Sequence, residues 1–269
     1  MRERIKHFLK RAGIYEDVSC CYHMLKQVTP HYLLKEVKYR LGRAPDGNRV
    51  PSPRLIFRII ARGWAEQYYA MGREAAAEII GHLESSGIDI GAMDDILDFG
   101  CGCGRIIRHI RLRTRARLYG SDYNYDLVRW CRDNLDFGKF DQNCLAPPLS
   151  YEDEKFDFIY LISVFTHLGA ELQQRWMIEL RRVLRPGGVM LFTTHGEPYK
   201  EFLTREQFER LLAGEVVVVD EDEEGKNHYG SFQTVENVES RLLDGFELIK
   251  YIKGRERLVQ DTYLVRKKT

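Results

Sequence analysis

The chain lacks a long apolar run near its start, because charged residues interrupt the N-terminal region every few positions. A secretory signal needs an uninterrupted apolar core, and a membrane-spanning helix needs about 20 apolar residues. We therefore expect no transmembrane segment and a cytoplasmic protein.

Cysteines are few, and their spacing does not suit a structural role. The six cysteines, at positions 20, 21, 101, 103, 131 and 144, include no C-x-x-C pair, and the chain has no H-E-x-x-H sequence or Walker loop. This pattern favours reduced thiols over a disulfide framework or a zinc site. We expect no metal.

Net charge is also nearly absent, since the formal value is +1. The whole molecule therefore exerts little electrostatic attraction on nucleic acid. The charges are unevenly placed, however: residues 1–62 hold 14 Lys and Arg against 5 Asp and Glu, and Asp220–Glu224 is wholly acidic. A solvated surface is the simplest interpretation of the basic region; contact with an anionic substrate, a membrane surface or nucleic acid is the alternative.

A chain of 269 residues, 44% of them hydrophobic, is long enough for one main core and a small appendage. In residues 1–41 apolar side chains such as Ile5, Phe8 and Leu9 recur at helical intervals, which predicts two or three short helices. A turn follows at 43–48, and Pro51 and Pro53 stiffen the next segment. We place a helical arm or lid at 1–50 and the main domain at 51–269.

The most informative stretch is Ile96–Arg105, where Asp98 precedes three alternating glycines, Gly100, Gly102 and Gly104. It predicts a buried strand, a turn, and a helix that starts at Gly104. Glycines let the backbone approach a ligand, and a helix N-terminus presents free N–H groups. The dinucleotide pattern G-x-G-x-x-G lacks its third glycine in either register. An acid before the glycines suits a cationic amine and sulfonium better than a pyrophosphate.

Strands and helices alternate beyond this turn, which predicts a parallel sheet with right-handed crossovers. The expected strands are Ile96–Phe99, Leu118–Asp122, Phe140–Cys144, Phe156–Ser163 and Val189–Thr194, the last entered through a turn at Pro186–Gly188. Thr204 and Thr234 should cap two helices, with a short β run at Val216–Val219 between them. Two final strands, Phe246–Ile252 and Thr262–Val265, have a short connection and should pair antiparallel.

Asp122 ends the second strand, where an acid is placed to accept hydrogen bonds from ribose hydroxyls. With the runs Phe156–Tyr160, Ser163–Leu168 and Arg182–Gly188, these stretches resemble the class I S-adenosylmethionine (SAM)-dependent methyltransferases. The resemblance implies an α/β, Rossmann-like, seven-stranded and mostly parallel sheet that ends in a C-terminal antiparallel hairpin. It also implies SAM as the cofactor and S-adenosylhomocysteine as its product.

The same resemblance implies a set of residues that bind the parts of SAM. The methionine part of SAM is expected to contact Asp98, Gly100, Cys101, Gly102, Gly104 and the Ile162 carbonyl. The ribose is expected at Asp122, and the adenine at Tyr123, Asn143, Cys144 and Leu145. The segment Val50–Arg58 resembles one that lies over the cofactor in some bacterial members. Arg58 there is a candidate for the methionine carboxylate, although a surface arginine is the simpler interpretation.

Two histidines remain near the expected position of the methyl group, His195 first and His167 second. A hydroxyl acceptor must lose a proton, and the imidazole pKa of about 6.5 suits a general base. Each histidine has an alternative role in shaping the pocket. His228 and Tyr229 are weaker candidates for substrate contact, and Cys101 and Cys103 are expected to be small spacers in the turn rather than nucleophiles.

The acceptor is expected to be a small molecule or a glycan, methylated at oxygen, as in the bacterial enzymes that the motifs resemble. Methylation of RNA or protein is an alternative supported only by the basic arm, which lacks the interleaved aromatics and glycines of an RNA-binding module. A non-catalytic SAM-binding scaffold and an NAD-dependent oxidoreductase are the remaining hypotheses. The sequence leaves the oligomeric state open.

Overall fold

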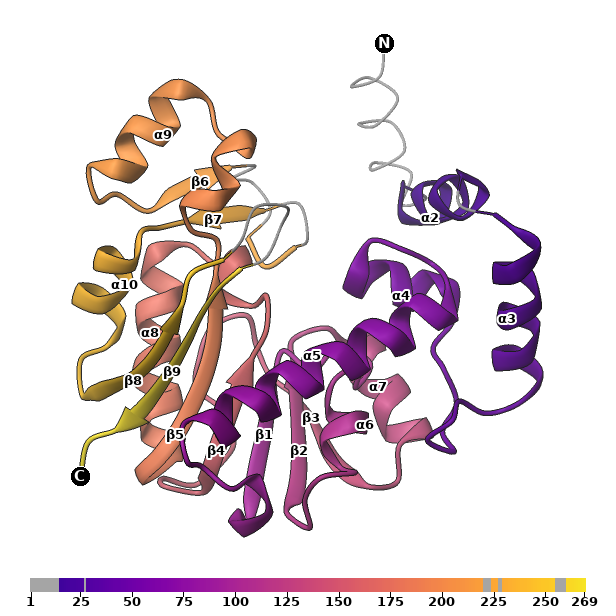
Figure 1. Cartoon of the computed structure of the whole chain (residues 1–269), viewed down its shortest axis with the longest axis horizontal. Helices are drawn as coiled ribbons and strands as arrows, with labels where there is room; N and C mark the ends of the chain where they lie inside the picture. The colour runs from indigo at the N-terminus through magenta and orange to yellow at the C-terminus, as the bar shows by residue number, and fades with distance from the viewer. Residues whose placement is uncertain (1–14, 27, 220–223, 227–228, 255–259) are drawn as a thin grey trace.

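The computed structural model describes residues 15–26, 28–219, 224–226, 229–254 and 260–269. Within them, seven strands form one sheet in the order β3-β2-β1-β4-β5-β9-β8 (Figure 1). The first five strands are parallel, and β9 runs antiparallel between β5 and β8. The strands are β1 Asp95–Phe99, β2 Arg117–Asp122, β3 Gly138–Gln142, β4 Phe156–Leu161, β5 Leu184–Thr194, β8 Phe246–Ile252 and β9 Asp261–Lys267. The predicted Rossmann-like sheet with its antiparallel C-terminal hairpin is confirmed.

Helices cover both faces of the sheet. Successive strand residues point to opposite faces, so Ile96 of β1 packs into the apolar cluster beneath α5, α6 and α7, and Leu97 packs into the cluster beneath α8 and α10. Both sets of strand side chains are apolar, as a sheet buried on two faces requires. These helices are α5 Ala65–Ser85, α6 Ile107–Ile110, α7 Tyr125–Asn134, α8 Ala170–Val183 and α10 Val235–Leu242. Among the described residues, no helix is both long and apolar enough to cross a bilayer.

The N-terminal arm consists of α2 Tyr15–Lys26 and α3 Pro30–Leu41 and is followed by α4 Pro53–Ile60. Helix α2 packs on α4, and α3 packs on α5. Helices are thus found in the arm as predicted, whereas Ile5, Phe8 and Leu9 lie outside the described residues.

A buried ion pair fastens the turn after α3 to α6. The Arg108 guanidinium donates to both carboxylate oxygens of Asp46, at 2.6 and 2.9 Å, and both side chains are fully buried. A buried charge persists only when it is paired in this way. The arm is therefore joined to the segment that directly follows the glycine turn.

Beyond β5 lies a small accessory unit. It contains the 3₁₀ helix η3 Glu197–Phe202, α9 Arg205–Leu212 and a separate two-stranded antiparallel sheet of β6 Val217–Val219 and β7 Gly230–Phe232. Thr204 caps α9 through a capping box with Gln207, as its position predicted. The strand β7 was not predicted, because three residues that begin with glycine carry no strand pattern.

Several sequence-based boundaries differ from the structure; the strand expected at Phe156–Ser163, for example, ends at Leu161. The third strand was expected at Phe140–Cys144, but β3 ends at Gln142, because its pairing with β2 runs from Gly138 to Gln142. The helix expected from Gly104 begins only at Ile107, because positive φ angles keep the glycine segment in turns. The turn at 186–188 falls inside β5, beside an irregularity in the β4–β5 register.

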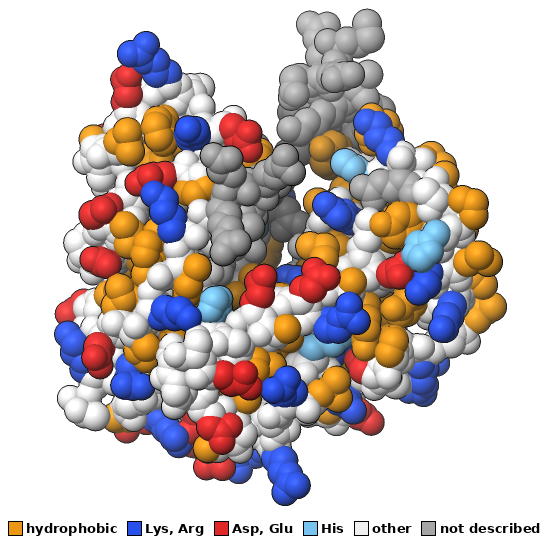
Figure 2. All heavy atoms as spheres, in the orientation of Figure 1, with side chains coloured by type: hydrophobic (Ala, Val, Ile, Leu, Met, Phe, Trp, Pro, Cys, Tyr) orange, Lys and Arg blue, Asp and Glu red, His pale blue; other side chains and the backbone are white. Residues whose placement is uncertain are grey.

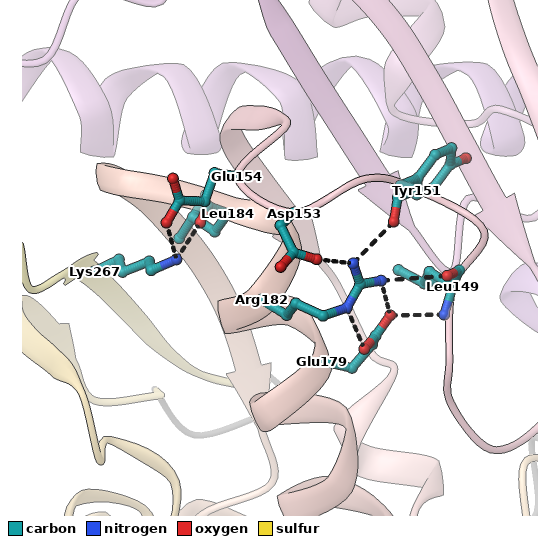
Figure 3. Close-up of polar contacts among 8 residues, drawn as sticks. All are labelled: Leu149, Tyr151, Asp153, Glu154, Glu179, Arg182, Leu184 and Lys267. Carbon is teal, nitrogen blue, oxygen red and sulfur yellow. Dashed lines mark hydrogen bonds and ion pairs between the residues drawn. The ribbon is translucent and has the colours of Figure 1, made fainter.

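Arg182 of α8 holds the connection between β3 and β4 against the sheet (Figure 3). Its guanidinium donates to the carbonyls of Leu149 and Tyr151 and to the carboxylates of Asp153 and Glu179. Glu179 in turn accepts from the backbone N–H of Leu149 at 2.7 Å. The connection that begins at Asn143 is therefore anchored at its far end by α8.

Candidate functional site

The glycine turn is shaped by backbone that other residues do not readily adopt. Gly100 and Gly102 have φ angles of 78° and 55°, in the left-handed region that favours glycine. A Cβ on Gly100 would lie 2.3 Å from Cγ2 of Val164, and one on Gly102 would lie 3.2 Å from Ile59 of α4. A Cβ therefore has no room at Gly100 and would press on Ile59 at Gly102, where α4 lies directly against the turn.

Two carboxylates flank this turn. Asp122 at the end of β2 accepts hydrogen bonds from the backbone N–H groups of Gly102, at 2.9 Å, and Asn124, at 2.8 Å. Asp98 in β1 is buried, and its Oδ2 has no hydrogen-bond partner among the described residues. Burial raises the pKa of Asp98 to about 7 and also raises the pKa of Asp122. A cationic ligand group would offset the cost of ionising Asp98.

The segment after β3 brings an amide beside these acids. Asn143 accepts from the Ser121 hydroxyl at 2.6 Å and donates to the carbonyl of Cys144 at 2.6 Å. The indole N–H of Trp176 in α8 donates to the carbonyl of Leu145 at 2.9 Å. Contacts from β2 and α8 thus hold the Asn143–Leu145 segment.

His167 lies in the 3₁₀ helix η2 Phe165–His167, after the end of β4. Its Nδ1 lies 2.8 Å from the carbonyl oxygen of Tyr229. A carbonyl only accepts, so Nδ1 carries the proton and the lone pair belongs to Nε2. The neighbouring Gly225 N–H donates to the His167 carbonyl at 2.8 Å, and the Tyr123 hydroxyl donates to the Gly225 carbonyl at 2.7 Å.

One cavity of about 670 Å³ joins these features. It is lined by nearly every residue expected to bind the cofactor and by one of the two histidines: Asp98, Gly100, Cys101, Gly102, Asp122, Tyr123, Asn143, Cys144, Leu145, Ile162 and His167. Gly104 is not among its lining residues; a Cβ there would meet Leu135, at 2.6 Å. The tertiary structure therefore brings together residues from four strand ends.

The cavity has further walls, one of which overlaps the segment Val50–Arg58 that was expected to lie over the cofactor. The arm and α4 contribute Tyr15, Arg54, Phe57, Ile59 and Ala61, and the loop before β7 contributes Gly225 and Lys226. Of the residues noted in this region, Arg58 does line the cavity, and its guanidinium also pairs with Asp126 at 2.8 Å. The resemblance of Val50–Arg58 to a segment that lies over the cofactor was the sequence signal that pointed to this wall.

His195, the first-ranked histidine, does not line this cavity. Its ring lies between Tyr199 and Phe232, with centroids 4.1 and 5.1 Å away. Burial, together with the charge that His167 can carry, lowers the pKa of His195 to about 3. Of the two histidines, the structure therefore places only His167 in the lining of this cavity.

The surroundings of Cys101 and Cys103 suit packing rather than catalysis. Cys101 and Cys103 are buried, and burial contributes to raising the pKa of each thiol well above its usual range; hydrogen bonding to Cys131 acts first on Cys101. Neither thiol is therefore an activated nucleophile. Tyr229 is buried and contacts His167 through its carbonyl, while His228 lies outside the described residues.

A strand-ending acid, a Cβ-free turn, a second acid and an open-sheet switch point define a nucleoside-binding site of the Rossmann type. Residues 97–192 match the family model described as "Methyltransferase domain". The part of the chain that holds most of the candidate site thus matches a methyltransferase domain.

Curated relatives agree with this assignment. The chain is 33% identical over 107 residues to methyltransferase GfsG of Streptomyces halstedii, which covers 38% of this chain and 37% of that protein. It is 28% identical over 137 residues to a tRNA N(3)-cytidine methyltransferase of Mus musculus, covering 46% of this chain and 35% of that protein. The chain thus spans little more than a third of the length of these relatives.

Solved structures show the same fold. An S-adenosylmethionine-dependent methyltransferase from Mesorhizobium loti has a TM-score of 0.55 at 16% identity, covering 70% of this chain and 96% of that one. The magnesium protoporphyrin IX methyltransferase of Synechocystis, solved with S-adenosylhomocysteine bound, has a TM-score of 0.52 at 15% identity, covering 75% and 86%. The fold of this chain is therefore one that binds S-adenosylhomocysteine in another protein.

Proposed function

We propose that this protein transfers a methyl group from SAM to a hydroxyl of a small molecule or saccharide. The observation that carries the proposal is that one cavity contains both strand-end acids, the glycine turn and a histidine whose Nε2 is the basic nitrogen. The family supports methyl transfer, and the histidine supports an acceptor that must lose a proton.

The residues present fit SAM. Asp98, whose buried Oδ2 has no partner in the part of the chain that the structure describes, would face the cationic methionine amine, with the Ile162 carbonyl beside it. Asp122 would accept hydrogen bonds from the ribose hydroxyls, and Asn143 would lie at the adenine. Since carboxylates favour cations and diol donors, this donor set matches SAM and disfavours a pyrophosphate.

SAM supplies an activated methyl group on a sulfonium that is a good leaving group. The protein therefore has to align the acceptor and exclude water. Ile59 of α4 lies against the glycine turn on one side, and the Tyr123–Gly225 hydrogen bond closes part of the other. These contacts enclose the reacting centre.

His167 is the better candidate for the general base. Its Nδ1 proton is held by the Tyr229 carbonyl, so Nε2 is the ring nitrogen that would take the acceptor's proton. His195 lies outside the cavity lining, and with a pKa near 3 it is a weak base. We therefore place His167 before His195 and give His195 a packing role.

We also propose that residues 51–269 form the catalytic domain and residues 1–50 an arm that closes over it. Helix α4 lines the cavity and lies after this boundary, so the catalytic domain supplies most of its own site. Tyr15 of α2 is the arm's contribution.

Titration calorimetry with SAM and S-adenosylhomocysteine tests the cofactor site. Both should bind the wild-type chain, and Asp122→Ala should weaken SAM binding by at least about tenfold because the ribose loses a charged acceptor. Asp133→Ala, at an exposed acid on α7, is the matched control. If neither ligand gives a heat of binding, both the proposed cofactor site and the proposed methyltransferase function are rejected.

Radiolabelled methyl transfer to a panel of hydroxyl, amine, RNA and protein acceptors tests the acceptor class. With a hydroxyl acceptor, His167→Gln should lower kcat by about 10²–10⁴-fold and leave SAM affinity unchanged. His195→Gln is the comparison and should lower kcat far less. Label found only in RNA or protein would reject the small-molecule acceptor.

A further inference from the structure

Helix α3 presents its aliphatic side chains to solvent. Leu34, Val37 and Leu41, at i, i+3 and i+7, lie on one face, with exposed fractions of 72%, 55% and 86%. Lys38 is exposed on the same face. We call these four residues the α3 face. No residue of α3 is buried.

Glu36, Tyr32 and Tyr39 of α3 face the protein instead. Glu36 accepts a hydrogen bond from the backbone N–H of Ala65 at 2.8 Å. Tyr32 stacks on Trp64 with ring centroids 5.4 Å apart, and Tyr39 lies 6.0 Å from Tyr69. The helix is thus inverted relative to an ordinary surface helix, whose apolar stripe faces the core.

Between residues 15 and 50, the described acidic side chains are paired with arginines, whereas several basic side chains are exposed to solvent. Among described side chains between residues 15 and 50, Asp46 is fully buried against Arg108, Glu36 pairs with Arg40, and Asp17 pairs with Arg54. Lys26, Lys38 and Arg43 are exposed. Blue and orange side chains gather on the edge of the molecule where α3 lies (Figures 1 and 2). The sequence before residue 15 adds five more Lys and Arg and one acid.

We propose that the α3 face binds the surface of a membrane rich in anionic lipid. The free energy falls when exposed aliphatic side chains of a helix leave water and enter the headgroup–acyl boundary. Neighbouring cations are attracted to anionic headgroups. Charge complementarity thus favours this occupant. A second copy of the chain fits less well, since a two-fold contact would bring the basic side chains of both copies together.

The test is co-sedimentation of the full chain with two kinds of vesicle, phosphatidylcholine alone and phosphatidylcholine with phosphatidylserine. Binding is expected only to the anionic vesicles and should fall as salt rises. Leu41→Ser should weaken it by on the order of tenfold, and Lys38→Glu by at least about fivefold. Binding that is absent, or equal on both vesicles, overturns the proposal.

Matched controls lie on α9, in the accessory unit. Leu212→Ser and Arg205→Glu change an exposed leucine and an exposed arginine, with exposed fractions of 57% and 93%, and should leave vesicle binding unchanged. If they reduce it as much as the α3 variants do, the α3 face is not the binding surface. Sedimentation equilibrium gives the other outcome: a dimer that Leu41→Ser dissociates, without vesicle binding, replaces the membrane with a second copy.

Discussion

Replacing Asp98 by asparagine should stabilise the ligand-free protein at neutral pH. Burial raises the pKa of Asp98 to about 7, whereas an unfolded aspartate titrates near 3.9. The fold therefore favours the protonated carboxyl, and its ionisation costs the native state up to about 4 kcal/mol once the pH exceeds 7. The cost is absent below roughly pH 4, where both states are protonated, and it grows as the pH rises to about 7.

Denaturant unfolding of both proteins across this pH range measures the effect. The difference in unfolding free energy should be small at about pH 4 and approach the full value near pH 8, with the asparagine variant more stable. Asp133→Asn, at an exposed acid, should change stability by less than about 0.5 kcal/mol throughout. A difference that does not vary with pH would refute the assignment of a buried, uncompensated carboxyl.

The same residue should give SAM binding a pH dependence. A cationic amine beside Asp98 favours the ionised carboxylate, so wild-type affinity should fall by roughly 15-fold between pH 7 and pH 5.5. The asparagine variant should bind weakly and without this dependence. Calorimetry in buffers of different ionisation enthalpy would detect the proton released on binding. Equal pH profiles for the two proteins would remove Asp98 from the site.

Three further outcomes are expected. Asp46→Ala should lower the unfolding free energy by about 3–5 kcal/mol in denaturant titrations, because its buried arginine partner loses its counterion. Gly100→Ala should lower both stability and SAM affinity, because its Cβ has no room. Gly187 has a similar φ of 74° and nothing within 4 Å of a Cβ, so Gly187→Ala should lower the unfolding free energy by only about 1 kcal/mol and keep SAM affinity. SAM should slow maleimide labelling of Cys144, which lines the cavity, and leave Cys21, also exposed, unprotected, as mass spectrometry would show.

The sheet could be predicted because its signals are local. Residues close together in the chain are enough to predict several elements: the strands β4 and β5, the helix caps at Thr204 and Thr234, and the helix Tyr125–Asn134. The errors arose where a non-local term decides. The end of β3 depends on its register with β2, and the short strand β7 exists only because β6 lies beside it.

The candidate cofactor residues were predictable for a related reason. In a parallel sheet the carboxyl ends of the strands meet at one edge, so motifs that follow strands converge whatever their separation in sequence. The two histidines both follow strands as well, and sequence alone could not separate them. Their difference depends on the Tyr229 carbonyl that orients His167 and on the two aromatic rings that enclose His195.

The sequence by itself determined the order of strands and helices and the acid–glycine–acid pattern, because backbone preference and apolar periodicity act between near neighbours. Only the tertiary structure decided that His167 rather than His195 borders the cavity, and that α3 turns its leucines outward. Each of these depends on contacts between segments far apart in the chain, such as the pair of Asp46 with Arg108. Such contacts leave no periodic pattern in the sequence.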